Sequence, residues 1–378
     1  MGLLTDPGVE KSMIPAFLFS YHRLLAVLFY VIGIVWFLGL AHNSLNHGTY
    51  FSENALLPGL VQGEFMGDSS SPRSFMALET EAEKYPNGVP YAWLLAQFTQ
   101  IGLDTHSHNF TLEYPMGNKV FKGRNIYGIL RAVRGSSTES LVVSAPYRPP
   151  SSLHQGTSAS IALMIALAQF FSEQVYWAKD IIFLVTEHEQ LGAQAWLEAY
   201  HRSSCGSGCW KAGIYPARAG PIQAAVNLEI GSSSLSHLDV KSRPQRTAAQ
   251  PRPRQPHPQT LPQGGTSTTP SRIMTTTLTP RRSMVAVHQL KTLVAMIATQ
   301  ATGIPNGNHG LFHRFGIASV TLEGVRQDGR TWRSSNLRQV GRVLEGICRS
   351  LNNLLERFHQ SFFFYLLPAT NRYISIGE

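Results

Sequence analysis

The segment Asp180–Tyr200 has the sequence DIIFLVTEHEQLGAQAWLEAY, which joins an apolar run, a charged cluster and a helical pattern. Ile181–Val185 is apolar at every position, which is typical of a strand that is buried on both faces. Glu187, His188 and Glu189 follow this strand at once. Ligands and catalytic groups of open α/β sheets gather just past the carboxyl ends of such strands, so this is where chemistry is expected.

Further apolar runs of the same kind recur along the chain, and helical patterns separate them. We predict strands over Asn125–Val133, Leu141–Ala145, Ile181–Val185, Ile222–Ile230 and Ile317–Leu322. We predict helices over Ser74–Lys84, Tyr91–Ile101, Ser158–Phe171, Met284–Ala301 and Leu337–Phe358. Strands that alternate with helices of this length predict an α/β fold with a mostly parallel sheet flanked by helices on both faces.

The excess of positive charge is local. The 378 residues carry a formal net charge of +9. Eight of the basic residues lie from Lys241 to Arg282, where there is no Asp or Glu, so the rest of the chain carries a formal charge of only +1. Because a global basic field and a nucleic-acid motif are both missing from the sequence, we expect no nucleic-acid partner.

An uncharged apolar segment, Leu24–Ala41, is long enough to span a bilayer. It exceeds the usual apolar core of a signal peptide, roughly 7–15 residues, so we predict an uncleaved transmembrane helix. Lys11 and Arg23 precede the helix, which predicts that residues 1–23 are cytosolic and that the body lies across the membrane. The sole glycosylation acceptor, Asn109 in Asn-Phe-Thr, is consistent with a lumenal body.

The sequence has three cysteines, and two of them lie close together in a Gly/Ser-rich stretch. Cys205 and Cys209 are either two unpaired thiols or, in an oxidising compartment, a small local disulfide. A zinc site on this pair is disfavoured, because no second Cys/His pair follows at finger-like spacing.

Polar side chains near the ends of the predicted strands suggest a metal site. A metal hydrolase needs three or four His, Asp or Glu ligands around each ion, and a carboxylate that acts as base. Glu187 or Glu189 is the candidate base, and the candidate ligands are His188, Glu229 and His309. The alternative is that these side chains are hydrogen-bonded polar caps of strand ends.

The order of elements resembles that of zinc-dependent aminopeptidases. In that family an H-x-D motif, a bridging Asp, a Glu-Glu pair, a later Asp and a final His hold the metal ions. The corresponding positions here are, in order, Ser144–Pro146, Leu153–Ser158, Glu187-His188, Glu229 and His309. The first position has neither ligand and the second has no carboxylate. The resemblance therefore implies a peptidase-like fold without a bridged two-zinc site and no cofactor, with one weakly held zinc ion on His188, Glu229 and His309 as the alternative.

Longer segments are similar to the Gaa1 family, whose members are subunits of the glycosylphosphatidylinositol (GPI) transamidase. These segments are Met1–Pro7, Ile34–Leu40, Thr49–Ala55, Tyr176–His188, Ala195–Tyr200, His309–Phe312 and Leu354–Pro368. The resemblance implies an endoplasmic-reticulum membrane protein with a lumenal peptidase-like domain over residues 42–240 and 283–358. It also implies, as partners, the other subunits, including the one that carries the catalytic cysteine, together with the GPI lipid and the proprotein substrate.

The chain departs from the family in two places. It stops at Glu378, soon after an apolar stretch, Phe362–Leu367, that is too short to span a bilayer. We therefore expect a truncated form in which residues 359–378 begin a C-terminal membrane region. The second departure is the segment 241–282, which is basic, holds eight of the 22 prolines and has no counterpart in the family.

Residues 241–282 have two interpretations. Their composition is typical of a disordered basic linker. Alternatively, Arg243–Pro258 can be back-translated so that the next reading frame codes GLNGQLPNLDLVNLI, which is similar to what the family carries here, so the segment is a frame-shifted read. Sequencing of the transcript across this interval distinguishes the two.

Three functions follow from these observations. The resemblance favours a non-catalytic membrane subunit that helps attach GPI anchors to the C-terminus of proproteins. The first alternative is an active, membrane-anchored zinc aminopeptidase. The second is a truncated isoform that cannot join the complex.

Overall fold

The computed structural model describes most of the chain. The described residues are 13–42, 45, 63–67, 70–86, 88–114, 119–134, 139–149, 151–152, 155–202, 210–212, 217–232, 235–241, 282–301, 307–326, 334–354, 365–369 and 372–375. Cys205 and Cys209, and all of the segment 241–282 except Lys241 and Arg282, lie outside them, so the predictions for these residues stay predictions.

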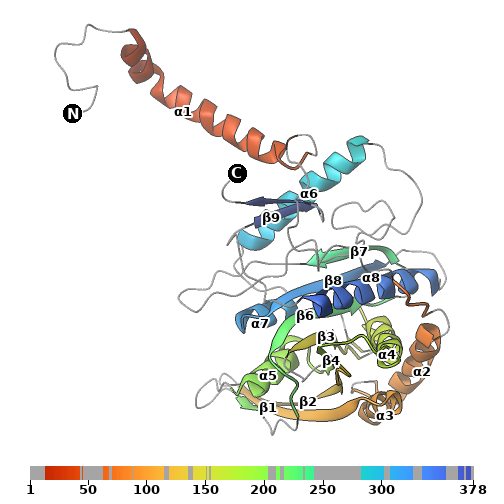
Figure 1. The fold of residues 1–378 in the computed structure, drawn as a ribbon. Coiled ribbons are helices and arrows are strands. Elements are labelled where there is room, and N and C mark those ends of the chain that lie inside the picture. The colour runs from red at the N-terminus through yellow and green to blue at the C-terminus, as the bar shows by residue number, and fades with distance from the viewer. Residues whose placement is uncertain are drawn as a thin grey trace.

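A mixed sheet organises the body (Figure 1), with the described strands in the order β5-β1-β2-β4-β3-β6-β8-β7. The strands are β1 (Asp104–Tyr114), β2 (Lys119–Leu130), β3 (Ser140–Pro146), β4 (Asp180–Thr186), β5 (Trp210–Ala212), β6 (Ile222–Ile230), β7 (Leu235–Lys241) and β8 (Ala318–Arg326). The four central strands, β4, β3, β6 and β8, pair in parallel. The flanking strands pair antiparallel. The predicted α/β class with a largely parallel sheet is confirmed.

Helices cover both faces of this sheet (Figure 1). The first face packs against α2 (Ser70–Lys84), α3 (Tyr91–Ile101), α4 (Ser158–Ser172) and α8 (Ser334–Asn353). The second face packs against α5 (Gln190–His201) and α7 (Asn308–Arg314). Successive side chains of a strand point to opposite faces, so a strand between two helical layers must be apolar at consecutive positions.

Strand β4 meets this requirement residue by residue. In β4, Ile181, Phe183 and Val185 join the core under the first helical layer, while Ile182 and Leu184 join the core under the second. All five of these side chains are at most 2% exposed. The unbroken apolar run in the sequence is thus the direct consequence of burial on two faces.

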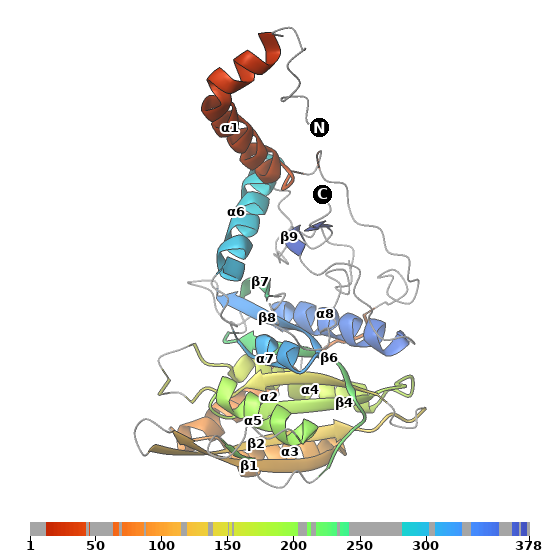
Figure 2. The same ribbon diagram turned by 90° about the vertical axis from the view of Figure 1, so that its left-hand side faces the viewer.

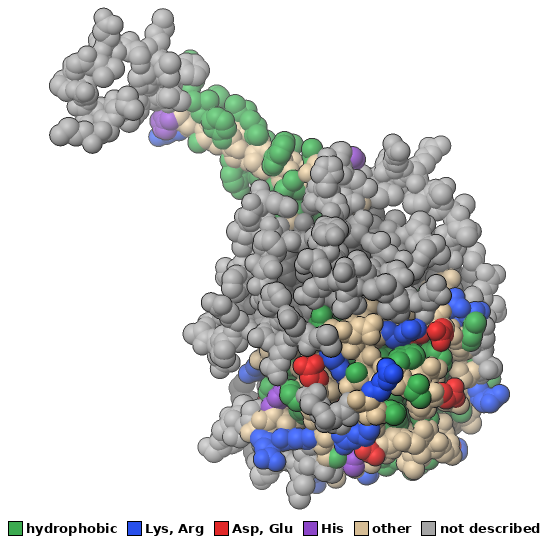
Figure 3. All heavy atoms as spheres, viewed as in Figure 1, with side chains coloured by type: hydrophobic (Ala, Val, Ile, Leu, Met, Phe, Trp, Pro, Cys, Tyr) green, Lys and Arg blue, Asp and Glu red, His purple; other side chains and the backbone are tan. Residues whose placement is uncertain are grey.

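A long apolar helix, α1 (Met13–Gly39), projects away from the body (Figures 1 and 2). Its segment Ser20–Gly39 has a mean hydropathy of 1.9 and is not buried in the protein, so by length and composition it is able to cross a membrane. Figure 3 shows apolar side chains along this helix, whereas charged side chains are scattered over the body. Leu40 and Ala41 follow the helix and pack against Leu293 of α6 (Arg282–Ala301).

Glu345 of α8 holds the segment that leads from the apolar helix into the body. This carboxylate is fully buried and accepts the backbone N–H of Glu64 at 2.8 Å and that of Phe65 at 2.9 Å. Arg349 lies one helical turn away and donates to the same carboxylate at 3.2 Å. Because Phe65 is itself only 1% exposed, the connection to the membrane-length helix is fixed to the core at this point.

The structure corrects several boundaries and adds strands. The polar strand β1 was not predicted, because the sequence DTHSHNFTLEY has few of the residues that favour strands at its start. The predicted strand Asn125–Val133 instead begins earlier and ends at Leu130. Near the end of the chain, β9 (Tyr365–Ala369) and β10 (Arg372–Ser375) form an antiparallel pair; that residues 359–378 begin a membrane region stays a prediction.

Acid should destabilise the fold through His313, a residue of α7 that is 2% exposed. Burial lowers the pKa of this imidazole from 6.5 to about 4. Since the unfolded chain then binds the proton more readily, the stabilisation is complete above pH 6.5 and is lost as the pH falls towards 4. We expect His313→Leu to reduce that loss by up to about 3 kcal/mol, measured by urea unfolding at pH 7 and pH 4. The control is His42→Asn at an exposed histidine; an equal change in both variants would contradict the prediction.

Candidate functional site

A row of buried polar side chains crosses three parallel strands near their carboxyl ends. Ser144 of β3 lies opposite Asn227 of β6, and Asn227 lies opposite Thr321 of β8. Asn227 is fully buried; it accepts a hydrogen bond from the Ser144 hydroxyl at 3.0 Å and donates to the Thr321 hydroxyl at 3.2 Å. Buried polar groups are costly unless paired, so this row favours one register of the three strands.

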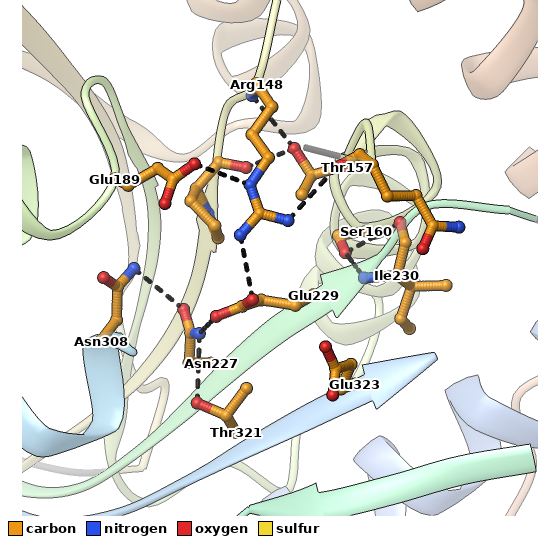
Figure 4. A network of polar contacts seen from close by, with 12 residues as sticks. Arg148, Thr157, Ser160, Glu189, Asn227, Glu229, Ile230, Asn308, Thr321 and Glu323 are labelled. Carbon is orange, nitrogen blue, oxygen red and sulfur yellow. Dashed lines mark hydrogen bonds and ion pairs between the residues drawn. The ribbon is translucent and has the colours of Figure 1, made fainter. Parts of the chain in front are cut away.

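Arg148 lies just beyond this row and joins two carboxylates (Figure 4). Its Nε donates to Glu189 at 2.9 Å and its Nη2 donates to Glu229 at 3.0 Å. Burial by itself would lower the pKa of this guanidinium, but the hydrogen bonds and charges of the two carboxylates offset burial and raise the pKa overall. Glu229 also accepts a hydrogen bond from Asn227 at 3.0 Å, which connects the ion pairs to the buried row.

The backbone around Arg148 is held in place by a threonine. The Thr157 hydroxyl donates to the carbonyl of Pro146 at 2.5 Å and accepts the backbone N–H of Arg148 at 3.2 Å. Nη1 of Arg148 donates to the carbonyl of Gln155 at 3.2 Å. The segment that follows β3 and the segment that precedes α4 are therefore bonded to each other directly.

Glu187 points away from Arg148. It accepts hydrogen bonds from the Tyr91 hydroxyl and from the backbone N–H of Arg124, both at 2.6 Å. Burial, and then the hydrogen bond to this carboxylate, raise the pKa of Tyr91. Glu187 is therefore a structural cross-link between α3, β2 and the end of β4.

A tight turn separates Glu187 from Glu189. His188 and Glu189 have φ angles of +56° and +50°, a region in which side chains other than Gly are strained by about 1–3 kcal/mol each. Gly192 makes the turn feasible, because a Cβ there would lie 2.0 Å from the carbonyl oxygen of Glu187. The turn directs Glu187 to Tyr91 and Glu189 to Arg148.

The two candidate histidines lie in different surroundings. The His188 side chain is 41% exposed, and its Nε2 lies 3.3 Å from the carbonyl of Lys122. His309, in contrast, is 2% exposed, and its Nδ1 lies 2.9 Å from the Thr321 hydroxyl. The structure thus separates His188 from His309 and pairs Glu229 with an arginine.

The residues do not fit the zinc ion that the aminopeptidase resemblance suggests as an alternative. Among the residues that the structure describes, no three His, Cys, Asp or Glu side chains are arranged so that they could hold a metal ion. A cavity of about 180 Å³ lies beside the network, lined by Pro146, Arg148, Glu189, Glu229, Lys241 and Asn308. Both carboxylates of this lining, Glu189 and Glu229, are already paired with Arg148.

The sequence analysis selected Glu229 as a candidate metal ligand but did not predict that Arg148 and Asn227 hydrogen-bond to it. The pairing depends on the direction of the chain after β3, and no local pattern in the sequence encodes that direction. Tyr91 carried no signal either, because its partner Glu187 is 96 residues away. Asn109, the predicted glycosylation site, is exposed on β1, opposite Arg124 of β2.

The fold and site define an α/β protein with a membrane-length helix and an arginine–carboxylate network at the carboxyl edge of its sheet. The profile of the family described as Gaa1-like, GPI transamidase component, matches residues 122–243 and 267–378, which is more than half of the chain. The chain belongs to this family. The unmatched residues 244–266 fall inside the Pro-rich segment 241–282.

Two curated relatives are similar to most of the chain. The GPI transamidase component gaa1 of Schizosaccharomyces pombe is 29% identical over 92% of this chain and 59% of its own length. The GPI transamidase component GAA1 of Saccharomyces cerevisiae is 28% identical over 87% of this chain and 50% of its own length. The chain thus spans between half and three-fifths of the length of these relatives.

Solved structures of other proteins are similar to a smaller degree. A leucine aminopeptidase precursor from Bacteroides thetaiotaomicron matches with a TM-score of 0.44 and 11% identity, over 76% of this chain and 99% of that chain. The glutaminyl cyclase of Fimbriiglobus ruber matches with a TM-score of 0.44 and 14% identity, over 77% of this chain and 98% of that chain.

Replacement of Gly192 tests the turn after β4. We expect Gly192→Ala to destabilise the chain by more than about 4 kcal/mol, because the new methyl group collides with a backbone carbonyl. The measurement is urea unfolding followed by circular dichroism. Gly88→Ala is the matched control, since a Cβ at that position meets no atom within 4 Å. Equal stability of the two variants would contradict this account of the turn.

Proposed function

We propose that this chain acts as a non-catalytic membrane subunit of the GPI transamidase complex and helps to attach GPI lipid to the C-terminus of proproteins. The observation that carries the proposal is the match of the Gaa1-like family to more than half of the chain. The relatives from both yeasts are described as components of the transamidase, which supports the same role here. The partners are the other subunits, including the one with the catalytic cysteine.

The proposed location is the endoplasmic-reticulum membrane, with the body in the lumen. The apolar segment Ser20–Gly39 supports a membrane anchor, because it is long enough to span and no protein core covers it. Lys11 and Arg23, which precede the uncharged segment Leu24–Ala41, support a cytosolic N-terminus. The exposed position of Asn109 leaves its side chain accessible to a lumenal glycosyltransferase.

The contacts of the candidate site support a non-catalytic role over the aminopeptidase alternative. A general base must be able to reach a substrate proton, and a carboxylate ligand must be able to reach a metal ion. Glu187 is instead held by Tyr91 and Arg124, while Glu229 is held by Arg148 and Asn227. Both carboxylates are therefore engaged in hydrogen bonds within the chain, which supports a structural role for them.

Co-purification tests the proposed assembly. We expect this chain, tagged and expressed in cells from which the native family member has been removed, to recover the cysteine-protease subunit from detergent extracts. A longer family member is the positive control, and an unrelated single-span reticulum protein is the negative control. Recovery by the longer protein alone would favour the isoform that cannot join the complex. Chelator-sensitive aminopeptidase activity of the purified chain would favour the enzyme.

A glycan on Asn109 tests the proposed topology. We expect translation of this chain with microsomes to yield a product whose mobility increases when the glycan is removed enzymatically. Asn109→Gln should abolish the shift, because the sequence has one acceptor site. Absence of the shift in the unaltered chain, while a second lumenal glycoprotein is modified in the same reaction, would contradict a lumenal body.

A further inference from the structure

The guanidinium of Arg148 lies between two carboxylates at the carboxyl edge of the sheet. Three of its nitrogens are engaged: Nε with Glu189, Nη2 with Glu229, and Nη1 with the carbonyl of Gln155. The side chains of Arg148 and Glu229 are each 14% exposed, and that of Glu189 is 38% exposed. Most of this network is thus shielded from solvent.

Two carboxylates that approach the same point need a cation between them. Without one, like charges repel, and a largely buried carboxylate is left uncompensated. Glu229 cannot turn away from this point easily, because its other oxygen accepts a hydrogen bond from the buried Asn227. The site therefore demands positive charge, which either a bound metal ion or a side chain is able to supply.

We infer that Arg148 is the resident cation of this site: its guanidinium takes the position that a metal ion would take between Glu189 and Glu229. The inference concerns the folded chain alone and does not rest on the proposed role in GPI transfer. With this guanidinium in place, the stability of the carboxyl edge of the sheet does not depend on a bound metal ion.

The geometry of the arginine suits this role better than that of a lysine. A guanidinium presents several N–H donors in a rigid fork, so it is able to hold two carboxylates at once. Here Thr157 holds the backbone of Arg148, and the carbonyl of Gln155 accepts a hydrogen bond from Nη1 of the guanidinium. Lys241, which lines the same cavity and pairs with Glu323, adds a second positive charge that disfavours a metal ion.

The test measures the thermal stability of the full chain in detergent, with ZnCl2 or with EDTA, for four proteins: unaltered, Arg148→Met, Arg148→Lys, and the double variant Arg148→Met with Glu229→Gln. We expect zinc and EDTA to leave the Tm of the unaltered chain unchanged. Arg148→Met should lower the Tm by roughly 4–10 °C, because it leaves the two carboxylates unpaired.

The remaining variants separate charge from packing. The double variant should regain part of the lost Tm, because one of the two unpaired charges is gone. Zinc should raise the Tm of Arg148→Met by a few degrees and should not affect the double variant. Arg148→Lys keeps the charge, so it should fold even if Arg148→Met does not, and it should lack a zinc response.

A matched control comes from the opposite end of the sheet. Arg131 also joins two carboxylates, Asp104 at 2.8 Å and Asp180 at 3.0 Å. Arg131→Met should lower the Tm without a zinc response, because the Asp104 side chain is 51% exposed and is able to turn into solvent, whereas Asn227 holds Glu229 in place. The inference would be overturned if zinc raised the Tm of the unaltered chain, or if Arg148→Met had the same Tm as the unaltered chain. It would also be overturned if the double variant were no more stable than Arg148→Met, or if zinc changed the Tm of Arg148→Met and Arg131→Met equally.

Discussion

Burial of the central strands on both faces is the constraint on which the rest of the structure depends. Because β3, β4 and β6 are covered by helices on each side, most of their side chains are apolar, including residues at consecutive positions. Such a pattern fixes the depth of a strand but leaves its register undetermined, since a shift by one residue exchanges one apolar side chain for another. The buried row of Ser144, Asn227 and Thr321 supplies the missing constraint on register.

That row also determines where charge accumulates. Asn227 bonds Glu229 on its own strand and accepts a hydrogen bond from Asn308 at the start of α7, at 3.3 Å. The same edge receives Glu189 from the strained turn after β4 and Arg148 from the segment after β3. The site is therefore a product of strand register, and each charged group arrives from a different part of the chain.

The sequence predicts the elements that burial governs and misses those that tertiary contacts govern. The strand Ile222–Ile230 was predicted with its observed ends, because its apolar pattern stops where the sheet stops. The strand β1 was missed, since its polar residues are stabilised by pairing with β2 rather than by their own propensity. The charged cluster Glu187–Glu189 is evident in the sequence. Which partner each of its two carboxylates contacts is not, because the contacts depend on the turn that Gly192 permits and on partners far away in the chain.

The carboxylates at this edge of the sheet are paired within the chain. An unpaired acid at the edge of a buried sheet would carry a considerable cost in free energy. Here each acid has a partner inside the chain: Glu187 has Tyr91, and Glu189 and Glu229 have Arg148. Groups of the chain itself therefore hold each of these acids at the carboxyl edge of the sheet.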